Sequence, residues 1–493
     1  MTATEVNPES IGRKAGRGLK WSLLGNVVTK FGSFGMGLVL ARLLTPADFG
    51  VYAVALAAMQ FVMHVNDVGL IAATVQWRGR LEDMAPTAAT LAAAFSIVIY
   101  GAFWVAAPAL ADIANVPEAT PIIRLLTVGI LVDGFTAVRS AALMRTFRQD
   151  KLIRANLIGL VVNATTAISL ASAGAGAYSF AAGQVAGSIV TGVVVFVVAA
   201  VPARVGIDRA IARKLMVFGI PLAASLGIEA ILMNADYIII GRYLDTTLLG
   251  YYLLAFNIST WALSVISSAV RYVSVAGFSR LSEVDAETLS DGVGRTLPLL
   301  FTGLVPICVL TAALATPLII VLYGTEWMAA APVLRFLMVL TMVRVLVSFA
   351  LDVLMGAGAT RFTLWVNLGW AAALVPALYY GTRHDQIRGA AIAHALVGIL
   401  VAVPVTVVAL HRVGVRLLPI LPTLVRPLFA GMLATLVTLA AEKLIGPHPV
   451  LSLSVSGTAG LVVYLLCAVT PRQLRQLRVA RGRPRPEAAH AVD

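Results

Sequence analysis

The chain has 493 residues, of which 59% are hydrophobic and only 12% charged, and its mean hydropathy is +0.90. Soluble globular proteins do not carry that much apolar surface, so the composition argues against a soluble fold and indicates a protein with many membrane spans. The net charge of +13 does not indicate nucleic-acid binding, because most basic residues gather in short segments between alternate apolar runs. We expect no nucleic-acid partner.

Apolar runs long enough to cross a bilayer follow one another from Leu19 to Thr470. At about 20 residues for each span, they predict about 14 transmembrane helices in an all-α polytopic membrane protein. Their approximate limits are 19–41, 49–72, 86–109, 121–146, 153–173, 178–201, 214–239, 247–272, 295–318, 329–355, 361–380, 388–410, 424–441 and 451–469.

The basic residues predict the orientation of these spans. With a cytoplasmic N-terminus, 27 of the 37 Lys and Arg residues fall in inside segments and five in outside loops. This positive-inside bias predicts a multi-pass membrane protein with both termini in the cytoplasm.

The sequence also repeats itself at an offset of 200 residues. The segments ARLLTPADFGVYAVA and GRYLDTTLLGYYLLA share five identities, and after an 11-residue insertion the repeat continues with Arg124 matched to Arg335. Because six spans separate the copies, they have the same orientation, which predicts two six-helix lobes related by a pseudo-two-fold axis along the membrane normal. The predicted divisions are a cytoplasmic tail at 1–18, an N-lobe at 19–205, a C-lobe at 206–412, two appended spans at 413–470 and a basic cytoplasmic tail at 471–493.

Polar residues within spans 1, 2, 7 and 8 recur at helical spacing, so that each span carries a polar stripe on one face. The stripes of spans 2 and 8 coincide at the 200-residue offset, and we infer that these four spans line a hydrated cavity between the lobes. The alternative is that the small polar residues hold neighbouring helices together. The candidate substrate-binding residues in the cavity are Lys30, Asn26, Gln60, His64, Asn257 and Ser264.

Charges within the spans give further candidates. Lys30 lies near mid-membrane, and Glu229 is expected at a similar depth in the other lobe. Lys30 would hold an anionic substrate group while Glu229 takes up a proton, or the two would form an ion pair that opens when substrate arrives; a purely structural pair is the alternative. The coupling or gate candidates are Glu229, Asp236, Asp67 and Arg271.

Three other intramembrane charges have a structural interpretation. Asp133 and Arg344 occupy the same repeat position, and we expect both to be structural because spans 4 and 10 carry no polar stripe. Arg139 lies near the cytoplasmic end of its span, where it belongs to an inner gate or extends its side chain to the membrane interface.

The sequence contains no catalytic or metal-binding motif of the familiar kinds. We therefore expect a protein that is not an enzyme and has no catalytic residue, metal site or cofactor. Transport would then draw on a proton or sodium gradient, or on the membrane potential.

Within span 1, Trp21 and Gly25 precede LARLLTPADFGVYAVA, and Asp67, Gly69 and Leu70 close span 2. With the later segment ADYIIIGRYLDTTLLGYYLLAFNI, these features resemble bacterial polysaccharide flippases of the multidrug/oligosaccharidyl-lipid/polysaccharide exporter superfamily. The resemblance covers about spans 1–12. It departs from the pattern of some relatives at Asn257, where a cation is common.

This resemblance implies a protein of the bacterial plasma (inner) membrane that works by alternating access. Its substrate would be an undecaprenyl-diphosphate-linked oligosaccharide, for an exopolysaccharide, O-antigen or related surface glycan. It implies as partners the lipid-linked substrate, membrane lipids, a polysaccharide polymerase and glycosyltransferases. Lys30 suits the cationic role that holds the diphosphate in related lipid II flippases.

Three other functions are weighed against this one. A cation-coupled multidrug exporter of the same superfamily needs an aromatic-lined pocket, whereas aromatic residues make up 8% of the chain and are sparse on the stripes. A membrane glycosyltransferase or polymerase usually presents a sizeable external loop, and the predicted external loops are all short. An assembly scaffold would tolerate neutral replacement of its buried charges.

Overall fold

The computed structural model describes residues 8–76, 81–146, 148–199, 205–217, 234–261 and 286–468. Within these ranges the chain is helical apart from short turns, and they contain no strand. Nine helices of the described part are long and apolar enough to cross a membrane. The all-α polytopic fold is thereby confirmed, and the count of 14 spans stays a prediction.

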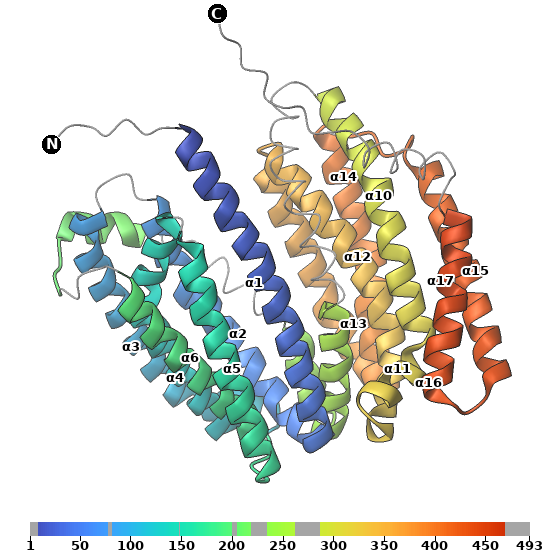
Figure 1. The fold of residues 1–493 in the computed structure, drawn as a ribbon, viewed down its shortest axis with the longest axis horizontal. Coiled ribbons are helices and arrows are strands. Elements are labelled where there is room, and N and C mark those ends of the chain that lie inside the picture. The colour runs from blue at the N-terminus through green and yellow to red at the C-terminus, as the bar shows by residue number, and fades with distance from the viewer. Residues whose placement is uncertain are drawn as a thin grey trace, which may run out of the picture. The chain divides into compact units, whose positions relative to one another are not determined.

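The described residues of the first part of the chain form a series of helices (Figure 1). They are α1 (Pro8–Leu43), α2 (Pro46–Gln76), α3 (Leu81–Ile113), α4 (Ala119–Arg145), α5 (Gln149–Ser172), α6 (Tyr178–Val198) and α8 (Ala235–Tyr243). A further helix occupies 246–261. The turn between α3 and α4 is only five residues long, which agrees with the expectation of short loops.

The second part continues in the same way, with short 3₁₀ and π segments between some helices. Its elements are α10 (Ala286–Ala313), α11 (Ala315–Leu322), η1 (Thr325–Ala330), α12 (Ala331–Gly356), α13 (Thr360–Val397), η2 (Gly398–Ala402), α14 (Val403–Arg412), α15 (Leu421–Ile445), α16 (Pro449–Leu451), η3 (Ser452–Ser456) and α17 (Gly457–Ala468).

The long element α13 is a hairpin of two helices. Its backbone leaves the helical conformation at Asp385 and Gln386, where Gln386 has φ +47°. A Cβ atom on Gly389 would overlap the carbonyl oxygen of Gly381, so the two arms meet through backbones that only glycine allows. The reversal falls between the predicted spans 361–380 and 388–410.

The chain forms two compact units. Unit 1 comprises Met1–Trp261, Leu322–Val333 and Asn367–Val397, and unit 2 comprises Ala262–Val321, Leu334–Val366 and Gly398–Asp493. Unit 1 therefore contains the predicted N-lobe together with segments of the second repeat. The predicted lobe boundaries themselves stay a prediction.

The segment TPADFG is the start of a helix. Thr45 donates from its backbone N and its Oγ1 to Asp48 Oδ2, at 2.9 and 2.7 Å, and Asp48 N donates to Thr45 Oγ1 at 3.3 Å. These bonds satisfy N–H groups that lack partners within the helix, and Pro46 has no N–H to satisfy. Asp48 also accepts from Ala177 N at 3.1 Å, which fixes the start of α2 to the start of α6.

In unit 1, neighbouring helices approach closely through small residues. A Cβ atom on Gly187 of α6 would lie 2.7 Å from the carbonyl oxygen of Gly159 in α5, and one on Gly192 would lie 2.5 Å from a methyl of Val132 in α4. Figure 1 shows α4, α5 and α6 side by side. Such backbone proximity provides the dispersion contacts that hold helices together in lipid.

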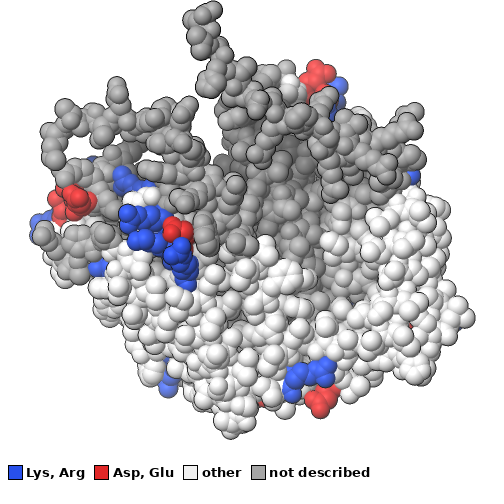
Figure 2. All heavy atoms as spheres, in the orientation of Figure 1, with Lys and Arg blue, Asp and Glu red and all other residues white. Residues whose placement is uncertain are grey.

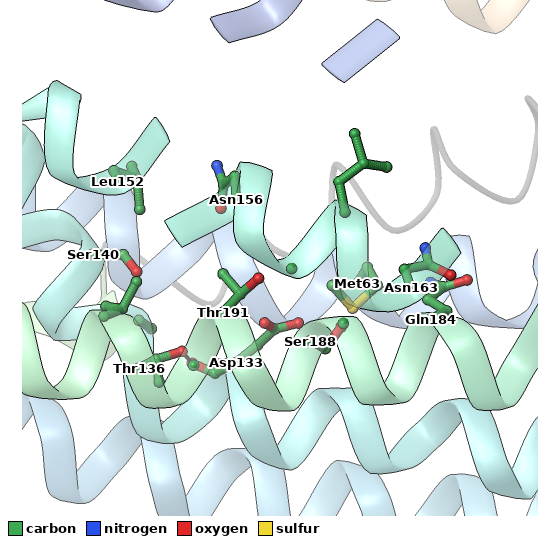
Figure 3. A pocket seen from close by; sticks show the side chains of 16 residues that line it. Met63, Asp133, Thr136, Ser140, Leu152, Asn156, Asn163, Gln184, Ser188 and Thr191 are labelled. Atoms are coloured by element: carbon green, nitrogen blue, oxygen red, sulfur yellow. Dashed lines mark hydrogen bonds between the residues drawn. The ribbon is translucent and has the colours of Figure 1, made fainter. Parts of the chain in front are cut away.

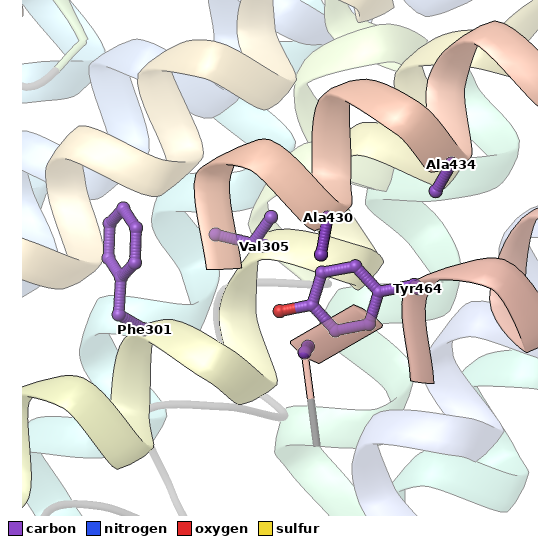
Figure 4. Packing of buried hydrophobic residues seen from close by; sticks show 6 residues of the cluster. Phe301, Val305, Ala430, Ala434 and Tyr464 are labelled. Carbon is purple, nitrogen blue, oxygen red and sulfur yellow. The ribbon is translucent and has the colours of Figure 1, made fainter. Parts of the chain in front are cut away.

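In unit 2, the last two long helices pack on α10. Phe301 and Val305 of α10 form a cluster with Ala430, Ala434, Tyr464 and Ala468 of α15 and α17 (Figure 4). The Tyr464 hydroxyl donates to the carbonyl oxygen of Thr302 at 2.8 Å, which joins α17 to α10. The predicted appended spans are therefore fastened to the helix of predicted span 9.

On the face drawn in Figure 2, the described Lys, Arg, Asp and Glu side chains lie toward the helix ends, and a broad uncharged surface lies between them. This distribution suits helices whose outer surfaces contact hydrocarbon.

We predict that Gly187→Ala destabilises the protein, because its new Cβ must displace the backbone of α5 at Gly159. Overpacking of this kind costs about 1–3 kcal/mol. Gly101→Ala is the matched control, since no heavy atom lies within 4 Å of a Cβ at that helical position. The melting temperature of the detergent-solubilised protein, followed by size-exclusion chromatography, should fall for Gly187→Ala alone. Equal melting temperatures would contradict the proposed packing.

Candidate translocation site and polar cavity

The exposed polar side chains of α1 lie near an aromatic contact. Asn26 and Lys30 are one turn apart, and both are exposed in the described structure. Phe34, one further turn along, stacks on Trp261 of helix 246–261, with ring centroids 4.8 Å apart and an interplanar angle of 28°. Asn257 is exposed one turn before Trp261. Residues one turn apart share a helix face, so Lys30 and Asn257 flank this contact.

The same contact includes Phe31, whose ring meets Trp261 edge-on at 5.3 Å. Phe31 is 55% exposed, so much of its ring is free to contact another molecule. The predicted polar stripes do not include these aromatic residues. Phe34 lies one turn from Lys30 and Trp261 one turn from Asn257, and this helical spacing is the signal that could have identified them.

The other predicted cavity residues are only partly described. The Gln60 side chain is exposed on α2. The backbones of His64 and Asp67 belong to α2, but their side chains lie outside the described part, as do the whole residues Glu229, Ser264 and Arg271. Their predicted roles stay predictions.

Asp236 is a buried carboxylate at the start of α8, with 1% of its surface exposed. The Tyr252 hydroxyl donates to Asp236 Oδ2 at 3.0 Å, and the backbone N of Tyr237 donates to Oδ1 at 3.0 Å. The carboxylate thereby holds α8 against helix 246–261. The repeat-related tyrosine, Tyr52, donates instead to Gln184 Oε1 at 3.0 Å. The coupling or gate role of Asp236 stays a prediction.

A polar cavity of about 360 Å³ lies among α4, α5 and α6, with Met63 of α2 at its edge (Figure 3). Each of the three helices contributes polar side chains at helical spacing. They are Asp133, Thr136 and Ser140 from α4, Asn156 and Asn163 from α5, and Gln184, Ser188 and Thr191 from α6. Among these lining residues, Asp133 alone is ionisable, so the cavity presents one carboxylate among neutral amides and hydroxyls.

The expectation that predicted span 4 carries no polar stripe is wrong. Asp133, Thr136 and Ser140 recur at i, i+3 and i+7, which places them on one face of α4, and that face lines the cavity. Polar residues at helical spacing on predicted spans 5 and 6 are the signal in the sequence that could have identified this cavity. Arg344, at the same repeat position as Asp133, belongs to unit 2.

Arg139 packs inside unit 1. It is 5% exposed, its guanidinium carbon lies 3.8 Å from the ring centroid of Phe196, and Nη1 donates to the carbonyl oxygen of Phe135 at 3.4 Å. A cation over an aromatic face is stabilised by the ring quadrupole. This geometry favours a structural role between α4 and α6 over a side chain extended to the interface.

The Tyr252 hydrogen bond generates a prediction about stability. Tyr252→Phe should destabilise the protein by about 1–3 kcal/mol, because a buried carboxylate loses a donor. Tyr380→Phe is the control, since Tyr380 is 62% exposed. Thermal melting in detergent should separate the two variants, and a Tyr252→Phe protein as stable as the control would show that this bond contributes nothing.

The family model described as "Polysaccharide biosynthesis protein" matches residues 39–332. The succinoglycan biosynthesis transport protein ExoT of Rhizobium meliloti (strain 1021) is 30% identical over 508 aligned positions, covering 100% of this chain and 99% of ExoT. The lipopolysaccharide biosynthesis protein WzxC of Escherichia coli (strain K12) is 21% identical, covering 79% of this chain and 80% of WzxC.

Solved structures share the fold. The lipid II flippase MurJ in an inward closed conformation matches with a TM-score of 0.77 at 13% identity, covering 93% of this chain and all of MurJ. An inward-facing multidrug resistance transporter of the MATE family matches with a TM-score of 0.63 at 16% identity, covering 78% of this chain and 94% of the transporter. At these identities the similarity concerns the fold alone.

Proposed function

The chain belongs to the polysaccharide biosynthesis protein family, and from this premise we propose that it is a flippase for a lipid-linked oligosaccharide. The observation that carries the proposal is the 30% identity to a succinoglycan transport protein along the whole chain. The fold agrees with it, because flippases and exporters share this arrangement of helices. Transport would proceed by alternating access across the plasma membrane, with both termini in the cytoplasm.

We propose undecaprenyl diphosphate as the lipid carrier and Lys30 as the cation that binds its diphosphate. The Lys30 ammonium is exposed on α1, with the Asn26 amide one turn away and Asn257 exposed on the neighbouring helix. A charge within a membrane span is costly and is generally retained for a functional partner. Moving roughly two negative charges outward, with the interior negative, gains about 2.3 kcal/mol per charge per 100 mV.

The polar cavity offers a place for energy coupling. It sets the Asp133 carboxylate among amide and hydroxyl oxygens in a space of about 360 Å³. A carboxylate with neutral amide and hydroxyl oxygens is a set of ligands that can hold a proton or a single sodium ion. We propose Asp133 as a coupling residue beside the earlier candidate Glu229.

As a flippase, the protein would be a transporter without catalytic residues. Glycosyltransferases would supply its substrate, and a polymerase would consume its product. The nearest rival is a cation-coupled multidrug exporter, which the MATE-like fold also permits. The full-length similarity to a polysaccharide transport protein favours the glycan.

We predict that Lys30→Gln lowers glycan export on the order of tenfold or more, because the diphosphate loses a charge-assisted hydrogen bond. Lys30→Arg should retain much of the export, since it keeps the cation. The assay is complementation of a strain that lacks the flippase, with the protein quantified in isolated membranes. The control is Lys443→Gln, which removes an equal charge from an exposed site at the end of α15. Normal export by Lys30→Gln would refute the diphosphate assignment.

We predict that Asp133→Asn abolishes the response of transport to an imposed ion gradient. The neutral amide carries no negative charge, so it neither takes up a proton nor attracts a sodium ion as the carboxylate does. Proteoliposomes with a lipid-linked oligosaccharide substrate would be tested under proton and sodium gradients separately. Asp83→Asn, an exposed carboxylate in the first turn of α3, is the matched control. If Asp133→Asn responded to both gradients like the control, the cavity would have no coupling role.

A further inference from the structure

The two sequence repeats meet at one end of unit 1 through a contact between glycines. Gly50 and Gly250 occupy the same repeat position. A Cβ atom on Gly50 would overlap the carbonyl oxygen of Thr246, and one on Gly250 would overlap that of Pro46. The first turn of α2 and the first turn of helix 246–261 therefore touch backbone to backbone. Both repeats retain the glycine that this approach requires.

Two arginines cross between the repeats at the same end. Arg42 Nε donates to the carbonyl oxygen of Leu322 at 3.2 Å, and Arg242 Nη1 donates to that of Asp112 at 3.3 Å. Arg42 and Arg242 occupy the same repeat position. Their acceptors nearly do so as well, because Asp112 corresponds to the residue after Leu322 when the 11-residue insertion is counted. In each repeat, one arginine thus donates a hydrogen bond to the end of the third predicted span of the other repeat.

Trp327 adds an apolar wedge to this contact. It is fully buried, and its Nε1 donates to the carbonyl oxygen of Ala41 at 2.9 Å. Its ring meets Phe49 of the first repeat with centroids 4.7 Å apart and Tyr251 of the second at 6.0 Å. The repeat counterpart of Trp327 is Val116, a smaller buried residue. The wedge is therefore made by one repeat only.

We propose that these contacts form an outer latch, comprising Arg42, Gly50, Arg242, Gly250 and Trp327, that opens and recloses in each transport cycle. The proposal rests on the flippase function and on the predicted topology, which places this end of the helices outside. While the latch is engaged it holds the two repeats together at this end, and in the proposed cycle they separate there when substrate reaches the outer leaflet.

The arginine hydrogen bonds and the glycine contact are of a kind that can break and re-form repeatedly. Both arginine side chains are exposed, so water can replace the carbonyl oxygens when the repeats separate. The glycine contact is made by backbone atoms, and Trp327 is the large side chain that leaves its buried position against Phe49 when the repeats separate. A permanent structural joint is the alternative, and it requires that the two repeats never separate at this end.

Cysteine cross-linking across the latch tests the proposal. A Cβ atom on Gly241, the neighbour of Arg242, would lie 3.5 Å from the Cβ of Ala114, within the range for a disulfide. The variant Gly241→Cys with Ala114→Cys would be made in a background with Cys308→Ala and Cys467→Ser. Oxidation of the double variant should lower glycan export at least tenfold, and dithiothreitol should restore it. Export by each single cysteine variant should not change when the oxidant is added. Undiminished export by the oxidised, fully cross-linked protein would overturn the latch.

A second measurement does not depend on transport. In the same background, Phe34→Cys serves as a reporter for a membrane-impermeant maleimide added outside intact cells. The double variant Arg42→Gln with Arg242→Gln should label about fivefold faster or more than the control Arg388→Gln, because lost hydrogen bonds shift the population toward the open state. Equal labelling rates would overturn the latch and leave the flippase proposal intact. A failure of the flippase proposal would appear instead as absent glycan export by the unmodified protein.

Discussion

Helices in a bilayer are not driven together by the hydrophobic effect, because lipid tails are as apolar as leucine. The described helices instead meet where glycines let backbones touch. Gly159 and Gly187 bring α5 against α6, and Gly381 with Gly389 folds α13 into a hairpin. At the end of unit 1, Gly50 takes part in the same kind of contact between the two repeats. Close backbone approach therefore shapes both the interior of a repeat and the contact between repeats.

Around this framework, polar groups are confined to places where they have a partner or a task. Asp236 and Arg139 are buried but engaged, the first by a tyrosine hydroxyl and the second by an aromatic face. Asp133 lines a cavity whose other polar groups are neutral, and Lys30 is exposed beside an aromatic contact. We propose that Lys30 binds the substrate and that Asp133 couples transport to an ion gradient, since charges are generally retained within a membrane for a function.

The duplicated scaffold carries unduplicated chemistry. Thr45 begins α2 with a capping box, whereas its counterpart Asp245 caps the next helix by accepting from Leu248 N at 2.7 Å. Both solutions satisfy the first N–H groups of a helix, so the repeat preserves the turn without preserving its residues. Functional groups differ more sharply, since Asp133 is matched by Arg344. The two charges proposed for substrate binding and coupling, Lys30 and Asp133, both belong to the first repeat.

The sequence by itself determined the class of protein, the family and the identity of long segments as spans. The span predicted at 121–146 is α4, Ala119–Arg145, because a long apolar run has few alternatives to a membrane helix. The polar faces on α1 and helix 246–261 also followed from periodicity. Only the tertiary structure decided which faces meet. Periodicity reports the face on which a side chain lies and is silent about the helix opposite it. For that reason the sequence did not reveal the cavity among α4, α5 and α6, the docking of α15 and α17 on α10, or the crossed arginines. Each of these depends on backbone approach between residues far apart in the chain.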